Sequence, residues 1–147
     1  MAQRKARDLD TLNRLHNWTV DERRRELGTL LAREQSLIET REAMAQELVR
    51  EQRTARDDPT EAGFIYDAYA KGHQLRREQL DRVLAALRGE IEEARERLAD
   101  AYRQQKVFEE VRKERLRQEE VEESRKEQVF FDEIAQTQFR QKRAVQE

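Results

Sequence analysis

The residues that could carry metal or acid–base chemistry are two histidines and many carboxylates. His16 and His73 lie far apart in the sequence, without the close spacing of a two-histidine metal site. There is no cysteine, so disulfides and cysteine-based zinc sites are excluded. Neither G-x-x-x-x-G-K-S/T nor G-x-G-x-x-G occurs, and no feature predicts the water-poor pocket that a catalytic carboxylate needs. We therefore expect no enzyme, and no cofactor, metal or small-molecule substrate.

The composition predicts an all-α protein. Charged residues make up 42% of the 147 residues, the mean hydropathy is -1.15, and there are one proline and four glycines. These are too few turn-forming residues for a β-sandwich or a βαβ fold. A net charge of -2 disfavours nucleic acid as a partner. No secretory signal or stretch of ~20 apolar residues occurs, so we expect a cytoplasmic protein.

The first expected helix covers about residues 8–56. Its apolar residues follow one another at spacings of three, four and seven, which is the pattern of a narrow stripe along one helix face. The stripe includes Leu27, Leu31, Ile38 and Leu48. The pattern stops at a turn of about residues 57–63, where Asp58, Pro59 and Glu61 have the types and spacing of an N-cap, a first helical residue and a capping box.

The second expected helix covers about residues 64–143 and carries a clearer heptad pattern. Apolar residues recur every seven positions at Leu80, Leu87, Ala94, Ala101 and Phe108, with Leu84, Ile91 and Leu98 at the complementary position. This is the a/d seam of a coiled coil, the line of side chains along which two helices pack. After Phe108 the seam positions become charged, although no residue breaks the helix.

One short turn between two long helices predicts an antiparallel coiled-coil hairpin in a single domain. If the turn is centred near Pro59, Leu9 lies opposite about Phe108, where the seam fades. The second helix then overhangs its partner by ~30 residues, about 45 Å. Its charged stretch offers the i,i+4 pairs Glu109–Lys113 and Glu122–Lys126.

Two aromatic groups are candidate binding surfaces. Phe64, Tyr66 and Tyr69 follow the turn and either close the hairpin tip or dock a partner. A second cluster lies on the expected overhang, where it either binds a partner, packs on the first turns of helix one or belongs to a frayed tail. Its members are Val129, Phe130, Phe131, Ile134 and Phe139.

The chain resembles a known family in three places. These are the run from Phe108 to Leu116, the run from Glu127 to Ala135, and Leu12–Leu15 followed by Asp21, Glu22 and Leu27. Together with the length and the single hairpin, they resemble the flagellar export protein FliJ family over essentially the whole chain. Phe130–Phe131 is more aromatic than the family pattern, and Gly72 lies inside the second helix.

The resemblance implies a stalk of the flagellar type III export apparatus. Such a stalk inserts its paired termini into the hexameric export ATPase (FliI-like), stimulates it, links it to the export gate protein (FlhA-like) at the inner membrane, and assists export chaperones. Ring contacts are then expected from the overhang, at Arg112, Arg115, Val129, Phe130, Phe131 and Ile134. Gate contacts are expected from Phe64, Tyr66 and Tyr69, and the free protein is expected to be a monomer.

Two other interpretations remain open at this stage. The YscO-like stalk of a virulence injectisome shares the same hairpin, and genomic neighbours would distinguish the two systems. A self-associating scaffold or tether is the alternative of a different class, because four clean heptads could also dimerise in parallel. Sedimentation would distinguish a monomeric stalk from such a dimer.

Overall fold

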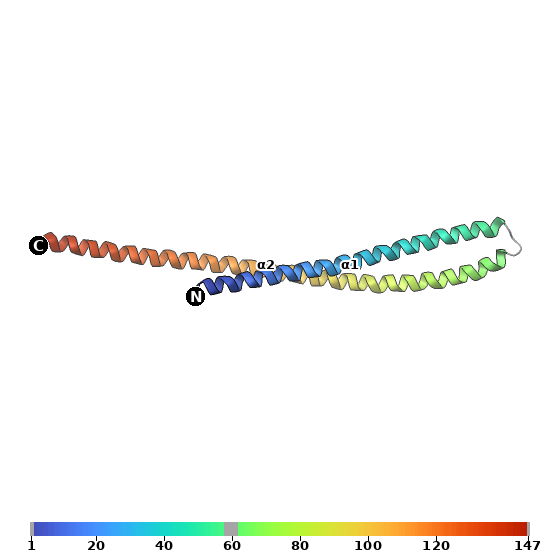
Figure 1. Cartoon of the computed structure of the whole chain (residues 1–147), viewed down its shortest axis with the longest axis horizontal. Helices are drawn as coiled ribbons and strands as arrows, with labels where there is room; N and C mark the ends of the chain where they lie inside the picture. Colours follow the sequence, from blue (N-terminus) through green and yellow to red (C-terminus); the bar gives the residue numbers. More distant parts are fainter. Residues whose placement is uncertain (1, 58–61, 147) are drawn as a thin grey trace. The chain divides into compact units, whose positions relative to one another are not determined.

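The computed structural model describes residues 2–57 and 62–146, with the side chains of 4–57 and 64–146, and all of these residues are helical. Helix α1 is Ala2–Asp57 and helix α2 is Ala62–Gln146 (Figure 1). The helices pack on each other as the predicted antiparallel coiled-coil hairpin. α1 begins about six residues before its expected start, and α2 ends three residues after its expected end. The predicted capping box at Asp58–Glu61 lies outside the described residues.

By its internal contacts the chain divides into two compact units, which are described separately. One unit is His16–Tyr102, and the other comprises Met1–Leu15 with Arg103–Glu147. Within the described residues, no helix is long and apolar enough to cross a membrane.

In the His16–Tyr102 unit, the cyan part of α1 and the yellow-green part of α2 run side by side in opposite directions (Figure 1). Most of the fully buried apolar side chains come from the heptads of α2. Leu84, Leu87, Ile91, Ala94 and Ala101 are each at most 5% exposed, and from α1 only Val20, at 3%, reaches this level among the described residues. A helix with a single partner can bury only the centre of its stripe, so the seam is narrow.

Most of the remaining predicted seam residues lie at the edges of this contact. Leu27, Ile38, Leu48, Leu80 and Leu98 are half-buried. Phe108 belongs to the other unit and is half-buried there. Leu31 is 36% exposed. Five of the best-buried positions are in the predicted heptad frame of α2, whereas Val20 is an apolar residue of the first expected helix. The buried side chains therefore follow the heptads of the sequence.

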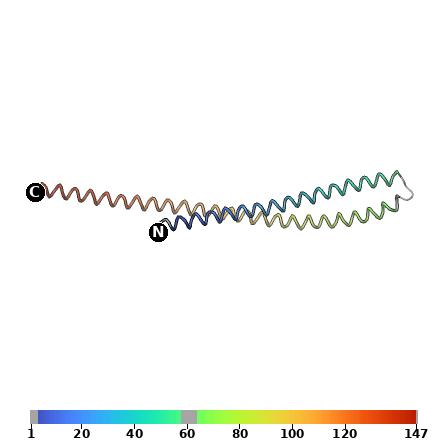
Figure 2. Tube along the Cα trace, viewed as in Figure 1, coloured from blue at the N-terminus to red at the C-terminus, as the bar shows by residue number. Residues whose placement is uncertain are grey.

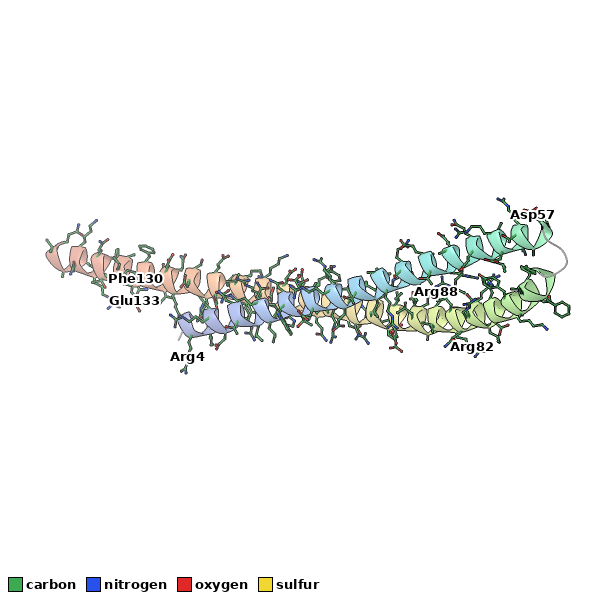
Figure 3. The ribbon with its side chains drawn as sticks, turned by 45° about the vertical axis from the view of Figure 1, so that its right-hand side comes forward. Arg4, Asp57, Arg82, Arg88, Phe130 and Glu133 are labelled. Atoms are coloured by element: carbon green, nitrogen blue, oxygen red, sulfur yellow. The ribbon has the colours of Figure 1, made fainter. Side chains whose placement is uncertain are left out.

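Ion pairs between the helices fix their register. Glu34 pairs with Arg88 at 3.3 Å, and Arg41 pairs with Asp81 at 3.3 Å. Figure 3 shows Arg88 between the two ribbons. The members of each pair are equally far in sequence from position 61. The pairing is thus centred about two residues later than the expected Pro59.

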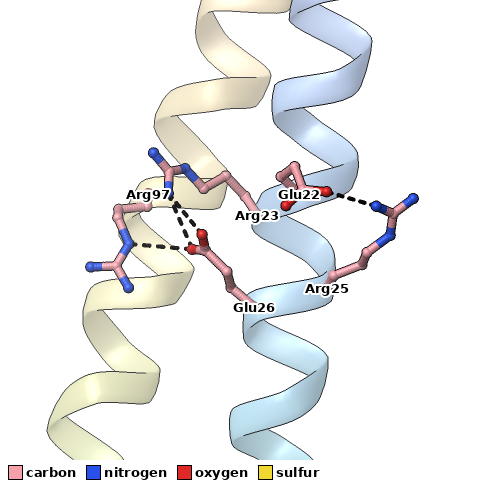
Figure 4. A network of polar contacts seen from close by, with 5 residues as sticks. All are labelled: Glu22, Arg23, Arg25, Glu26 and Arg97. Carbon is pink, nitrogen blue, oxygen red and sulfur yellow. Dashed lines mark hydrogen bonds and ion pairs between the residues drawn. The ribbon is translucent and has the colours of Figure 1, made fainter.

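A polar network on the same unit connects the helices again near residue 26. Arg97 of α2 lies 3.8 Å from Glu26, which also pairs with Arg23 at 3.1 Å, while Glu22 and Arg25 pair at 2.6 Å (Figure 4). Near the same level, Arg24 donates to the Tyr102 hydroxyl, and its guanidinium carbon lies 5.3 Å from the centroid of that ring. Such exposed pairs contribute little energy, but they select one register.

In the second unit, the first turns of α1 lie against α2 just after Arg103. Arg112 pairs with Asp10 at 3.2 Å. Leu9 lines a shallow groove with Arg115 and Gln118, and the α2 wall of this groove ends at Glu122. Leu9 therefore lies about one to two turns further along α2 than the expected Phe108. The Arg112–Asp10 pair is also centred on position 61, and a centre two residues later than Pro59 moves every opposed position by about four.

Beyond Glu122, α2 continues to Gln146 without α1 beside it, as the red end of the tube in Figure 2 shows. This predicted overhang is roughly 24 residues, or about 36 Å at 1.5 Å per residue.

Candidate partner-binding site

The candidate site is the stretch of α2 from residue 113 to 146, called the shaft below. Every one of its described side chains is exposed. Its helix is supported locally, because Glu114 pairs with Arg117 at 2.8 Å and Glu122 with Arg125 at 3.1 Å. The expected i,i+4 pairs are replaced by i,i+3 pairs, and Lys113 lies 3.8 Å from Glu110. Arginine reaches a carboxylate one turn away equally well at either spacing.

One of these ion pairs shifts the pKa values of both its members. The Arg117 guanidinium donates to the Glu114 carboxylate at 2.8 Å, and this hydrogen bond, together with the opposite charge, holds the pKa of Glu114 below its usual value. The same contact raises the pKa of Arg117. A carboxylate and a guanidinium that stabilise each other remain charged over the physiological range. This pair therefore presents one fixed negative and one fixed positive charge on the shaft.

The aromatic cluster is exposed, and its members lie on different sides of the helix. Phe130 and Phe131 are 59% and 63% exposed, and their ring centroids lie 6.0 Å apart in an edge-to-face arrangement. Ile134 lies one turn from Phe130, and the two line the same shallow depression. Figure 3 shows Phe130 and Glu133 on a stretch of α2 that has no turn of α1 beside it.

Val129 and Phe139 do not lie on the helix face that Phe130 and Ile134 share. At about 100° per residue, Phe139 lies roughly 180° around the helix from Phe130, and Val129 lies roughly 140° from Ile134. Val129 and Phe139 are 53% and 65% exposed. Large apolar side chains therefore surround this part of the helix and do not form a single stripe. The positions around the helix follow from the sequence alone, by a helical-wheel projection. The prediction from the sequence had nevertheless grouped the five residues as one cluster.

The two arginines expected in the same site differ from each other. Arg112 is engaged with Asp10 and its side chain is 38% exposed. Arg115 is exposed and borders the groove that contains Leu9 and Leu12. Arg112 thus joins α1 to α2, whereas Arg115 remains available on the surface.

The second candidate surface follows the turn, and the structure separates its three residues. Phe64 is 88% exposed, whereas Tyr66 and Tyr69 are half-buried. The Tyr69 ring lies 6.3 Å from the His73 ring, and the Arg76 guanidinium carbon lies 5.8 Å from the Tyr69 centroid. Tyr69 therefore packs at the tip.

His73 is the buried polar side chain of this region. It is 5% exposed, and its Nε2 lies 3.0 Å from the Met44 carbonyl oxygen, to which it donates. Burial raises the pKa of the neighbouring Tyr69 hydroxyl, and the Glu47 charge raises it further. His73 thus connects α2 to α1 near the tip.

Two exposed residues near the tip were missed by the sequence analysis. Ile65 is 70% exposed and Leu75 is 68% exposed. Both are apolar residues outside the a/d seam, and from this position their exposure could have been predicted from the sequence. Among the described residues, no group of three or more His, Cys, Asp or Glu side chains is arranged to hold a metal ion.

No curated protein and no solved structure matches the chain. One family model, described as flagellar FliJ protein, matches residues 5–144, which include both helices and the shaft. The chain is therefore a coiled-coil protein of flagellar protein export and belongs to the flagellar FliJ protein family.

Proposed function

We propose that this protein is the stalk of the flagellar type III export ATPase, and that its shaft enters the central opening of the ATPase hexamer and stimulates ATP hydrolysis. The observation that supports this proposal is the exposed shaft with large apolar side chains on several sides. A helix that binds one flat surface needs a single apolar stripe. A helix enclosed by a ring can contact protein in every direction.

The stimulation has a simple physical basis. A single helix inside a six-subunit ring cannot present the same side chains to every subunit. Phe130 and Ile134 face one way and Phe139 about the opposite way, so different subunits meet different contacts. Contacts that favour one conformational state of a subunit shift its population toward that state. The shaft thereby makes the subunits of the ring unequal.

The test is ATP hydrolysis by the export ATPase of the same genome, with and without this protein. Full-length protein is expected to stimulate at about one stalk per six ATPase subunits, which is the ratio of a ring around one shaft. Truncation after Leu116 is expected to abolish stimulation, because it removes the exposed aromatic residues. The proposal is wrong if the truncated protein stimulates as well as the full chain.

Single substitutions test the enclosure itself. Phe130→Ala and Phe139→Ala are each expected to lower the stimulation, since they remove contacts on opposite sides of the shaft. Leu75→Ala, at an exposed position in the His16–Tyr102 unit, is the matched control and should stimulate normally. If only Phe130→Ala lowers the stimulation, the partner contacts one face and is not an enclosing ring.

The tip is proposed to contact the export gate at the cytoplasmic side of the inner membrane, and the chain is also proposed to bind export chaperones. For the gate, the support is Phe64, the most exposed aromatic ring among the described residues. Phe64→Ala is expected to weaken binding of the cytoplasmic part of the gate protein, and the single substitutions Tyr66→Ala and Tyr69→Ala are each expected to weaken it less. Unchanged binding in all three variants would show that these residues only close the hairpin tip and do not bind the gate protein.

A further inference from the structure

We propose that the shafts of two copies of this chain pair in an antiparallel dimer, related by a two-fold axis near residue 132. The pairing stands independently of the proposed ATPase contact, although it would cover Phe130 and Ile134. It is carried by the charges of the shaft and by one apolar stripe on it.

The charges of the shaft are separated along its length. The acidic stretch, residues 119–127, has five carboxylates and two cations, whereas the basic tail, residues 137–146, has three cations and no carboxylate. In the part of the chain that the structure describes, no ion pair is formed by Glu119, Glu120, Glu123 or Glu127, nor by Arg140, Lys142 or Arg143. These charges are available to another molecule.

This separation selects both the partner and its direction. In a parallel pair, each acidic stretch would face its own copy, and like charges would repel. In an antiparallel pair, the acidic stretch of each chain faces the basic tail of the other, at both ends of one isologous contact. A second copy of this chain is thus a complementary partner for the shaft.

An apolar stripe lies on the side where the two shafts would meet. Phe130, Ile134 and Val145 lie within about 60° of one another around the helix. They are 59%, 38% and 86% exposed. With the axis near residue 132, Phe130 of one copy lies beside Ile134 of the second copy.

The polar positions of this stripe match in the same register. Glu123 comes opposite Gln141 of the second copy, and Glu127 comes opposite Thr137. Arg140 and Lys142 lie on the two flanks of the stripe, about 80–120° from its centre, whereas Arg143 lies on the far side. Arg140 and Lys142 can therefore reach the opposing acidic stretch, and Arg143 cannot.

The association is expected to be weak and sensitive to salt. The matching charges are exposed, and the contact includes only a few large apolar side chains, so the electrostatic part is screened at about 0.5 M salt. The monomer expected from the sequence is then the species that predominates at low protein concentration or at high salt, in equilibrium with the dimer.

Sedimentation of the full-length chain over a range of concentrations at low salt tests the proposal. The wild-type chain is expected to dimerise. The variant Arg140→Glu with Lys142→Glu is expected to raise the dissociation constant about tenfold or more. Arg143→Glu is the control on the far side of the helix, with half the change of charge of the double variant, and should dimerise like the wild type.

A complementary variant and a cross-link test the direction of pairing. Glu119→Lys with Glu123→Lys should be monomeric alone, yet should associate when mixed with the Arg140→Glu, Lys142→Glu chain. Because the natural chain has no cysteine, Glu123→Cys and Gln141→Cys chains can be mixed and oxidised, and the mixed disulfide should exceed either homodimer.

Three results would overturn the proposal. They are a wild-type chain that stays monomeric at every concentration, a dimer that survives Arg140→Glu with Lys142→Glu, and an Arg143→Glu chain as monomeric as that double variant. The last two would place any self-association elsewhere on the chain or in net charge alone.

Discussion

The His16–Tyr102 unit and the shaft are both built from long, highly charged helices, yet they are stabilised in different ways. In the hairpin unit, apolar residues return every three or four positions, so one line of side chains is buried: Leu84, Leu87 and Ile91 are 2–3% exposed. In the shaft, most of the same heptad positions hold charges, and all described side chains are exposed. The periodicity of the apolar residues, and not the overall composition, determines whether such a helix packs against another helix of its own chain.

The energies differ accordingly. The hairpin unit combines apolar burial with ion pairs between helices that are distant in sequence, such as Glu34–Arg88. The shaft depends on helix propensity and on contacts within one turn, such as Glu114–Arg117. A single helix with such contacts gains only tenths of a kcal/mol from each. The shaft therefore keeps its side chains free for a partner, and it contributes little to the stability of the fold.

The largest expected effect is the loss of a seam leucine. Leu84→Ala should lower the free energy of unfolding by about 2–5 kcal/mol, because it removes a buried side chain from a seam with little room to collapse. Leu116→Ala, on the exposed shaft, should change it by less than about 0.5 kcal/mol. Urea unfolding followed by circular dichroism measures both. Equal effects would show that the shaft is packed against the same chain.

A glycine substitution should have a smaller effect of the opposite sign. Gly89 is helical, and an added Cβ would meet no atom within 4 Å, so Gly89→Ala should stabilise the hairpin by up to about 1 kcal/mol. In the shaft, the reverse change Ala135→Gly should reduce local helicity and leave the urea midpoint unchanged. Hydrogen exchange and urea unfolding separate the two results. A shifted midpoint for Ala135→Gly would contradict the difference between the regions.

The ion pair between Glu34 and Arg88 should contribute still less. A double-mutant cycle with Glu34→Gln and Arg88→Gln should give a coupling of about 0.2–1 kcal/mol, because both side chains are partly exposed. The same cycle on Glu114 and Arg117 of the shaft should give no coupling in global unfolding. A coupling in the shaft as large as that across the helices would contradict this assignment.

The smallest expected effect is a change of shaft helicity with pH. The pKa of Glu114 is lowered from the ordinary 4.5 by Arg117, so its contribution is fully present above about pH 4.5. It is lost as the pH falls through the lower pKa of the folded helix. Hydrogen exchange of the amides around Glu114 should show this loss in the wild type. Glu114→Gln should remove that part of the pH dependence, and an unchanged profile would contradict it.

Much of the fold follows from the sequence, because helical periodicity is local. The heptads between Leu80 and Phe108 predict α2 and its buried positions Leu84, Leu87 and Ile91, and the charged residues after Phe108 predict the overhang. The two-sided arrangement of Phe130 and Phe139 is also present in the sequence, since 3.6 residues per turn fix it.

What only the tertiary structure decided is how the helices are matched and what lies between them. The register that joins Glu34 to Arg88 and Asp10 to Arg112 depends on where the turn is centred, and a displacement of two residues there moves every opposed position by about one turn. The hydrogen bond that His73 donates to the Met44 carbonyl depends on that register as well. The sequence determined each helix and its apolar face, because those depend on near neighbours, whereas the contacts between residues far apart in the chain were determined only when the helices packed.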